Sequence, residues 1–149
     1  ADLAVAANIP DRYISSPEQR MDIYRRIALI RTEEEADDLT DELIDRFGET
    51  PPGVNALIHV ALLRGEAGRA GITDISQKQG TLRFTLSDFD MEKVSALYAR
   101  DEYKNRLRVE AGSKPCLSLK IKNKNRVIDE ARSFAADWAA CGQTAEQST

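Results

Sequence analysis

Residue types on which much protein chemistry depends are scarce in this chain of 149 residues, which has one histidine and two cysteines. Cys116 and Cys141 are too few for a disulfide framework, and they lie far from the other ligand types that a metal site needs. We therefore expect two reduced, buried thiols. Aromatic residues make up only 6% of the sequence, which predicts a mainly aliphatic core.

Long apolar runs are also missing, because no uninterrupted stretch approaches the roughly 18 residues that a membrane-spanning helix requires. No secretion signal is recognisable. These absences predict a soluble, cytoplasmic protein. The first residue is Ala1 rather than Met, which indicates a piece of a longer protein.

Motifs of enzyme active sites are absent as well. The sequence has no Walker A loop, dinucleotide-binding fingerprint, nucleophile elbow or Cys/His pair. His59 lies on the flank of a predicted helix, where a lone histidine is far more often a surface residue than a base or ligand. Gly65, Gly68 and Gly71 follow a helical pattern rather than a strand, so they do not form a phosphate loop. We expect no catalysis, no metal and no cofactor.

The patterns that are present describe helices followed by hairpins. Ser16-Pro17-Glu18-Gln19 and Thr32-Glu33-Glu34-Glu35 are typical of helix starts. Alternating apolar residues on either side of Gln79-Gly80, and again between Leu107 and Ile121, indicate two hairpins. The spacing of apolar residues predicts helices near residues 17–31, 33–47, 53–69, 90–100 and 124–141.

This order predicts an α+β fold with N-terminal helices, a mainly antiparallel sheet built from two hairpins, and a C-terminal helix. We expect a single domain at 16–142. An extended arm at 1–15, in which Leu3 and Val5 alternate with polar or small residues, would arrive from the upstream part of the parent protein. Gly142 is placed to end the last helix, and 143–149 would be a disordered tail. Seven side chains are expected to share one core: Leu43, Phe47, Leu57, Phe84, Leu119, Phe134 and Trp138.

Charge is unevenly distributed, although the net charge is only −4. Residues 31–50 contain nine acids and two bases. On a helix, four of these acids fall within a sector of about 60°, with Glu42 at its border; we call Glu34, Asp38, Asp41 and Asp45 the acidic face. Like charges four residues apart each destabilise an exposed helix by about 0.2–0.5 kcal/mol. A basic partner would explain this pattern, and so would a solvated surface.

A basic segment supports an alternative function. Residues 101–126 contain eight bases and three acids, which fits an accessory nucleic-acid-binding module using residues 104–126. Aromatic residues are missing between Lys104 and Arg126, which argues against base stacking. Lys120, Lys122 and Lys124 would equally protect an edge strand from pairing with another chain.

Three strings of residues resemble the C-terminal domain of bacterial transcription-repair coupling factors (Mfd). They are Ile9-Pro10-Asp11-Arg12-Tyr13-Ile14, Tyr24-Arg25-Arg26-Ile27 and Glu42-Leu43-Ile44-Asp45-Arg46-Phe47-Gly48. The resemblance extends over about residues 9–75. The chain departs from the family at Gly65 and Gly68, where helix formers or basic residues are usual, and this bears on the length of the third helix.

The resemblance implies a regulatory function inside a larger DNA repair protein. The parent protein would be an ATP-dependent DNA translocase whose motor motifs lie upstream. This domain would dock intramolecularly on the UvrB-like N-terminal module and mask the UvrA-binding surface, with UvrA and RNA polymerase as indirect partners. Membranes and direct nucleic-acid contacts are not expected.

The resemblance also indicates which residues would dock. Glu42 and Asp45 map to the docking surface, with Asp38, Asp41 and Arg46 beside them on the same helix. Reversing Glu42 and Asp45 to Arg is predicted to leave the domain folded, since both side chains lie away from the apolar face.

Overall fold

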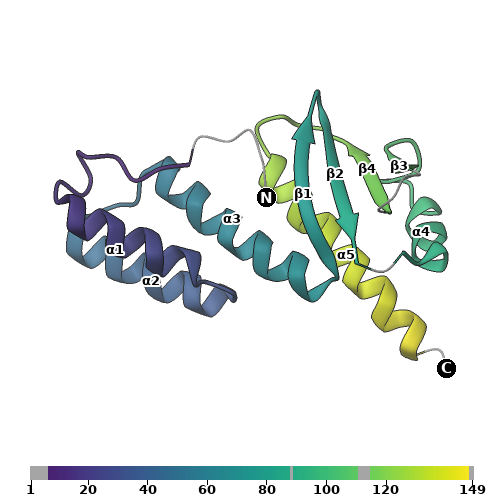
Figure 1. The fold of residues 1–149 in the computed structure, drawn as a ribbon, viewed down its shortest axis with the longest axis horizontal. Helices are drawn as coiled ribbons and strands as arrows, with labels where there is room; N and C mark the ends of the chain where they lie inside the picture. The colour runs from purple at the N-terminus through teal and green to yellow at the C-terminus, as the bar shows by residue number, and fades with distance from the viewer. Residues whose placement is uncertain (1–6, 88, 111–114, 148–149) are drawn as a thin grey trace. The chain divides into compact units, whose positions relative to one another are not determined.

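The computed structural model describes residues 7–87, 89–110 and 115–147, with side chains described up to Cys141 (Figure 1). Within this part of the chain, contacts group residues 7–65 and residues 66–147 into two compact units. The boundary between the units falls inside α3 (Pro52–Arg69), so this helix contributes residues to both. The described residues form five helices and one four-stranded antiparallel sheet, which confirms the α+β prediction.

The unit of residues 7–65 is helical and contains α1 (Pro17–Ala28), α2 (Glu33–Phe47) and most of α3. The Ser16 side chain accepts a hydrogen bond from the Gln19 amide and the Thr32 side chain accepts one from Glu35, so both predicted N-caps are confirmed. α2 has the predicted bounds. α1 ends three residues early, because the amides of residues 29 and 30 bond to carbonyls three residues back and turn Ile30 into the core.

The core of this unit is aliphatic, as the composition predicted. It includes Leu43, with no exposed surface, together with Ile23, Ile27 and other residues of the three helices. Ile9 and Ile14, which precede α1, are buried in the same cluster. The described part of the predicted arm at 1–15 therefore belongs to the core, while Leu3 and Val5 lie outside the described residues.

α3 continues through Gly65 and Gly68 to Arg69, so the two glycines that depart from the family pattern do not shorten it. A Cβ atom at Gly65 would lie 2.8 Å from the Arg31 carbonyl oxygen, closer than real Cβ atoms approach. Glycine at position 65 thus lets the backbone around Arg31 pack directly against α3. A Cβ atom at Gly68 would meet nothing within 4 Å.

The unit of residues 66–147 is built on a sheet of order β1-β2-β4-β3. Its strands are β1 (Ile72–Lys78), β2 (Thr81–Leu86), β3 (Leu107–Glu110) and β4 (Cys116–Lys120). Both predicted hairpins are confirmed. Gln79 and Gly80 have φ angles of 48° and 77°, the left-handed conformation that a two-residue hairpin turn requires. The predicted turn at Gly112 lies outside the described residues.

α4 (Met91–Tyr98) and α5 (Val127–Gln147) complete this unit. The Asp90 side chain caps α4, and Phe134 of α5 stacks on Phe84 of β2 with ring centroids 4.1 Å apart. α5 therefore covers one face of the sheet, behind the strands in Figure 1. It runs beyond Gly142, where the sequence predicted its end, because an interior glycine costs a helix only about 1 kcal/mol. Of the predicted disordered tail, residues 148 and 149 lie outside the described part.

The prediction of one shared core is wrong. Leu43 belongs to the core of residues 7–65, where Phe47 and Leu57 are only partly buried. The other four side chains are buried in the second unit: Phe84, Leu119, Phe134 and Trp138. Periodicity identified the apolar faces, but it contains no information about which faces pack together.

Candidate functional site

α2 presents the predicted acidic face to solvent. Ala36, Leu39 and Leu43 are buried, which fixes the rotation of the helix. Consequently Asp38, Asp41 and Asp45 are all exposed, and within the described part of the chain they take part in none of the ion pairs. The structure thus brings together three of the predicted docking residues as a row of free carboxylates.

Glu42 differs from its neighbours because it is already paired. Both of its carboxylate oxygens accept hydrogen bonds from the Arg26 guanidinium of α1, one of them at 2.9 Å. Arg46, one turn further along α2, donates to the same carboxylate at 3.1 Å. The Arg26 hydrogen bonds, together with the contact from Arg46, lower the pKa of Glu42 to about 2, against the opposing effect of burial.

This arrangement corrects the expectation that Glu42 can be reversed without harm. An arginine at position 42 would replace a bridging carboxylate with a third cation beside Arg26 and Arg46. Asp38 and Glu42 are like charges four residues apart on α2, and their repulsion is likewise offset by these cations. Glu42 joins α1 to α2, so its first role is structural.

Ile44 is a surface residue that the sequence analysis missed. It lies on α2 between Leu43 and Asp45, and the residue is 43% exposed. The sequence around Ile44 did not indicate that this residue is exposed, since an isoleucine inside an apolar pattern is normally assigned to the core. An exposed aliphatic side chain beside free carboxylates is a suitable apolar anchor for a protein partner.

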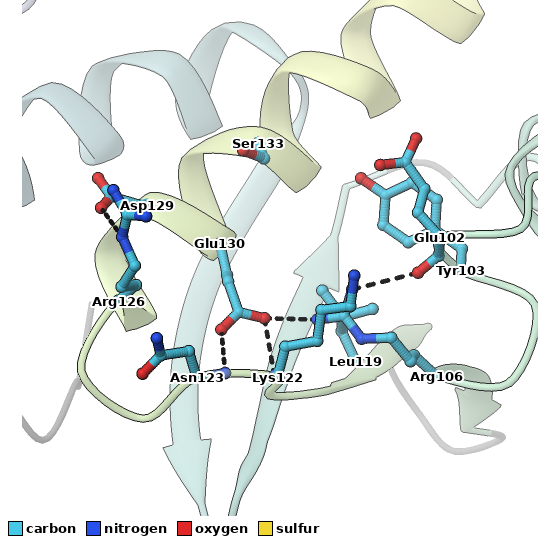
Figure 2. A pocket seen from close by; sticks show the side chains of 10 residues that line it. All are labelled: Glu102, Tyr103, Arg106, Leu119, Lys122, Asn123, Arg126, Asp129, Glu130 and Ser133. Atoms are coloured by element: carbon cyan, nitrogen blue, oxygen red, sulfur yellow. Dashed lines mark hydrogen bonds and ion pairs between the residues drawn. The ribbon is translucent and has the colours of Figure 1, made fainter.

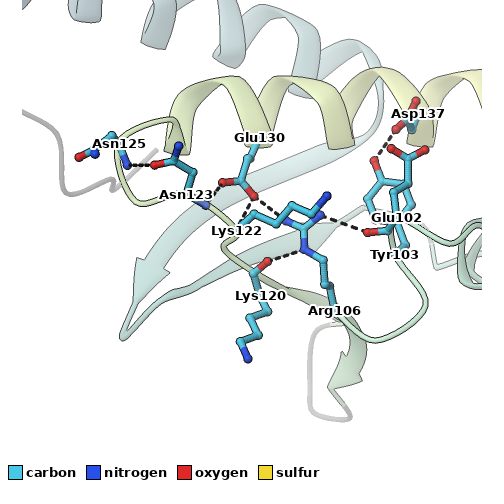
Figure 3. Close-up of polar contacts among 9 residues, drawn as sticks. All are labelled: Glu102, Tyr103, Arg106, Lys120, Lys122, Asn123, Asn125, Glu130 and Asp137. Atoms are coloured by element: carbon cyan, nitrogen blue, oxygen red, sulfur yellow. Dashed lines mark hydrogen bonds and ion pairs between the residues drawn. The ribbon is translucent and has the colours of Figure 1, made fainter.

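In the basic segment 104–126, some of the side chains already form hydrogen bonds and ion pairs within the domain. Arg106 donates to Glu130 of α5 at 2.5 Å and to the backbone carbonyl of Glu102 (Figure 2). It also donates to the backbone carbonyl of Lys120. Glu130 also accepts from the amides of Lys122 and Asn123, both at 2.9 Å, and so fixes the loop before α5 (Figure 3). These side chains line a hollow of about 500 Å³. The Glu130 carboxylate at its centre already accepts hydrogen bonds from Arg106, Lys122 and Asn123. We therefore assign this carboxylate to holding the loop.

The role predicted for the lysines of β4 as protection of an edge strand is wrong. β4 lies between β2 and β3 in the sheet, so Lys120 is at the end of an interior strand. Lys122 and Lys124 follow in the loop. The edge strands among the described residues are β1 and β3.

Buried ionisable groups also occur away from the acidic face. The Tyr103 hydroxyl donates to Asp137, and burial, assisted by this carboxylate, raises the pKa of Tyr103. Burial likewise raises the pKa of the Cys141 thiol, the opposite of what a reactive cysteine requires. Cys116 and Cys141 are half-buried rather than buried, and neither forms a disulfide.

His59 is exposed, as predicted. Within the described ranges, no three histidine, cysteine or acidic side chains are grouped as metal ligands. In the same part of the chain, no helix combines the length and the apolar character needed to cross a membrane.

Comparison with known proteins places these features in a family. A family model described as the TRCF domain matches residues 3–97, more than half of the chain. The chain belongs to the TRCF domain family. This confirms the resemblance drawn from the sequence.

Relatives of this TRCF domain are transcription-repair-coupling factors. The protein of Bacillus subtilis is 32% identical over 134 residues, which is 87% of this chain and 11% of the relative. The Escherichia coli protein is 35% identical over 85 residues, 56% of this chain and 7% of the relative. The Mycobacterium tuberculosis protein is 35% identical over 107 residues, 69% of this chain and 9% of the relative. The chain therefore spans about a tenth of the length of the curated relatives that it matches.

A solved structure described as the C-terminal domain of transcription-repair coupling factor shares the fold of this TRCF domain. The TM-score is 0.78, and the match covers 96% of this chain and 94% of that chain at 21% sequence identity. At this identity the comparison concerns the fold alone. It supports the arrangement of helices and hairpins described above.

Several residues that carry the family resemblance maintain the fold of this TRCF domain. The Tyr13 hydroxyl donates to the carbonyls of Leu43 and Gly48 at the end of α2, at 3.3 and 2.8 Å. The carbonyl of Ile14, at the end of the first of the three strings, accepts a hydrogen bond from the Arg20 guanidinium at 2.7 Å. Asp45 and Ile44, in contrast, contribute little to the core. Both are exposed at the surface of α2.

Proposed function

We propose that this chain is a non-catalytic regulatory domain of a transcription-repair coupling factor that works by protein docking. Its acidic face binds the UvrB-like N-terminal module of the same protein and thereby masks the surface that recruits UvrA. Docking in this sense is autoinhibition within transcription-coupled DNA repair. The proposal assigns contact roles to Asp45, Asp41, Asp38 and Ile44, with Glu42 and Arg46 at the border.

The observation that carries the proposal is the difference between Glu42 and the acids beside it. Asp38, Asp41 and Asp45 repel one another along α2, whereas Glu42 is neutralised by Arg26 and Arg46. A basic partner would relieve this repulsion and cover Ile44. The resemblance to Mfd suggests the candidate partner, because it implies an intramolecular docking site on the UvrB-like module, and the membership of the TRCF domain family supports that resemblance.

Binding in trans tests the docking step directly. The isolated chain is titrated with the UvrB-like module, and the same titration is repeated with an Asp41→Arg/Asp45→Arg variant. Loss of desolvated interfacial charge pairs should weaken binding by about 30-fold or more. Glu92→Arg/Asp101→Arg changes the net charge equally at exposed positions of the other unit, and it should bind like the wild type.

Masking is tested in the full-length protein by measuring UvrA affinity. If docking hides the UvrA-binding surface, Asp41→Arg/Asp45→Arg should bind UvrA more tightly than wild type, and the control pair should not. Thermal melts of both variants establish that the fold is intact. Equal UvrA affinities together with undiminished binding in trans would reject the proposed role of the acidic face.

A further inference from the structure

The face of the sheet opposite α5 is lined by cations arranged in two rows. In one row Arg83 of β2 and Arg108 of β3 pair directly with Ser118 of β4, one on each side. In the next row Lys120 of β4 pairs with Thr81, which pairs in turn with Lys78 of β1. Neighbouring strands are about 4.8 Å apart, so the backbones of Arg83 and Arg108 lie at about equal distances on either side of Ser118.

Ser118 is a donor without a partner at the centre of these cations. Its residue is 6% exposed, and it is the buried polar residue of the described core. Its Oγ atom makes no hydrogen bond among the described residues. A buried hydroxyl left unpaired destabilises a protein by about 1–3 kcal/mol, so its presence between two arginines calls for an acceptor from outside.

These side chains line one continuous hollow of about 640 Å³ on the open face. Ile121 is the sole large apolar residue among those that line it, and no aromatic side chain does. Figure 3 shows the Lys120 side chain pointing away from α5, toward this face. Protein-binding surfaces usually have aromatic or aliphatic anchors at their centre, whereas surfaces that bind nucleic-acid backbone are polar and positively charged.

The carboxylate of Glu110 already lines the hollow, but it does not accept a hydrogen bond from Ser118. Glu110 of β3 pairs with Arg83 at 2.6 Å, and Ser118 nevertheless remains unpaired. Glu110 is tethered to β3, whereas a backbone phosphate arrives from outside, and each of its two charged oxygens can accept more than one hydrogen bond, so it can accept from Ser118 and from both guanidiniums together. The absence of aromatic side chains from the lining removes the stacking platform that single strands use.

We infer that this hollow binds the phosphate backbone of a nucleic-acid duplex without reading its sequence. Arg83, Arg108 and Lys120 contact phosphates, and Ser118 donates to one of them. Glu110 competes with the phosphate for Arg83. The inference rests on the open face of the sheet alone and does not depend on docking through α2.

The test uses the whole chain and a fluorescently labelled DNA duplex of mixed sequence, with anisotropy measured at about 50 and about 200 mM salt. Sequence-independent binding is expected, with a dissociation constant of about 10⁻⁴–10⁻⁶ M that weakens steeply with salt. Arg108→Gln/Lys120→Gln should weaken binding about tenfold at the lower salt concentration and reduce the salt slope by about two. Arg12→Gln/Arg25→Gln removes the same charge at exposed positions of the other unit and should change neither quantity.

Two single variants test whether duplex binding depends on the arrangement of side chains in the hollow rather than on net charge alone. Ser118→Ala should weaken duplex binding about threefold to tenfold while its melting temperature stays equal or rises, because an unpaired buried hydroxyl is removed. Glu110→Gln should strengthen binding, since it releases Arg83. A Ser118→Ala variant that melts earlier and binds normally would show that the hydroxyl serves the fold instead.

Three results would overturn the inference. The first is no anisotropy change at the lower salt concentration, and the second is equal weakening by the control pair. The third is tighter binding of an acidic peptide of matched charge than of the duplex, which would identify the face as a protein-docking site. Tighter binding of the duplex, with the expected ranking of the variants, would confirm it.

Discussion

Glu42 has a structural role that its position in an acidic string conceals. Its carboxylate lies between the guanidiniums of Arg26 and Arg46, with about two fifths of its side chain exposed. Exposed ion pairs are each worth only about 0.2–1 kcal/mol, because water screens them. Two pairs on one carboxylate, one of them bidentate, should lie near the upper end of this range.

Replacing Glu42 with glutamine should therefore lower the free energy of unfolding by about 1 kcal/mol at neutral pH. Asp45→Asn is the matched control, and it should change stability by less than about 0.5 kcal/mol. Urea unfolding of the three proteins measures both effects. An effect of Asp45→Asn as large as that of Glu42→Gln would contradict the assigned roles.

The difference in stability between the wild type and Glu42→Gln should depend on pH, and the direction of the Glu42 pKa shift determines how. The pKa of Glu42 is lowered in the folded state to about 2, whereas an unfolded glutamate has a pKa of about 4.3. Its stabilising contribution is therefore fully present above the unfolded value and disappears as the pH falls through about 2. Wild type and Glu42→Gln should converge in stability between about pH 5 and about pH 2. A difference that stays constant over this interval would exclude the ion pair as its source.

α3 contains two glycines whose surroundings are opposite in character. Gly65 faces the Arg31 backbone so closely that a methyl group there would lie 2.8 Å from the carbonyl oxygen, whereas Gly68 is exposed and open. Alanine is preferred over glycine inside a helix by about 1 kcal/mol when nothing obstructs the methyl group. The same substitution should thus have opposite signs at the two positions.

We expect Gly68→Ala to raise the free energy of unfolding by about 0.5–1 kcal/mol. Gly65→Ala should lower it by about 1–3 kcal/mol, because the Arg31 backbone must move to admit a methyl group. Chemical denaturation of both variants measures these two changes in the free energy of unfolding. Stabilisation by both substitutions would show that the contact between α3 and the Arg31 backbone is easily displaced.

Local features of the elements were predictable from the sequence, because their causes are local. The Ser16 and Thr32 caps and the Gln79-Gly80 turn each depend on residues within one turn of the chain. The pairing of β2 with β4 was not predictable, because it depends on contacts between strands that are far apart in the sequence. The Arg26–Glu42 pair was missed for the same reason, since it spans 16 residues and requires α1 to lie against α2.

The candidate site was predictable only as a face of one helix. The spacing of Asp38, Asp41 and Asp45 placed them together correctly, since helical geometry alone determines their directions. Which acids are free and which are paired depends on a neighbouring helix. The cationic face of the sheet was beyond prediction, because it is assembled from four strands whose order the sequence does not state.

The division of the chain into two units has a measurable consequence. The single tryptophan, Trp138, is buried in the unit of residues 66–147, so its fluorescence reports on that unit alone. Leu43→Ala should destabilise the helical unit by about 2–5 kcal/mol, the usual cost of a cavity at a buried leucine. In urea, this variant should lose far-UV circular dichroism in an early step that leaves Trp138 fluorescence unchanged.

Leu119→Ala supplies the reciprocal control, because Leu119 is buried in the unit that contains Trp138. Its fluorescence transition should move to a lower urea concentration. If fluorescence and circular dichroism coincide in both variants, the two units unfold as one cooperative structure and the expectation is wrong.

The hydrogen bond from Tyr13 to the Gly48 carbonyl joins residues 35 positions apart, and this separation should determine when the bond forms during folding. Closing a flexible loop of this length costs about 3 kcal/mol of chain entropy, whereas contacts within a helix form almost without such a cost. The segment before α1 should therefore dock after the folding transition state has passed. Tyr13→Phe should speed unfolding about fivefold and leave the refolding rate unchanged in stopped-flow measurements. Slower refolding with unaltered unfolding would instead make this early segment part of the folding nucleus.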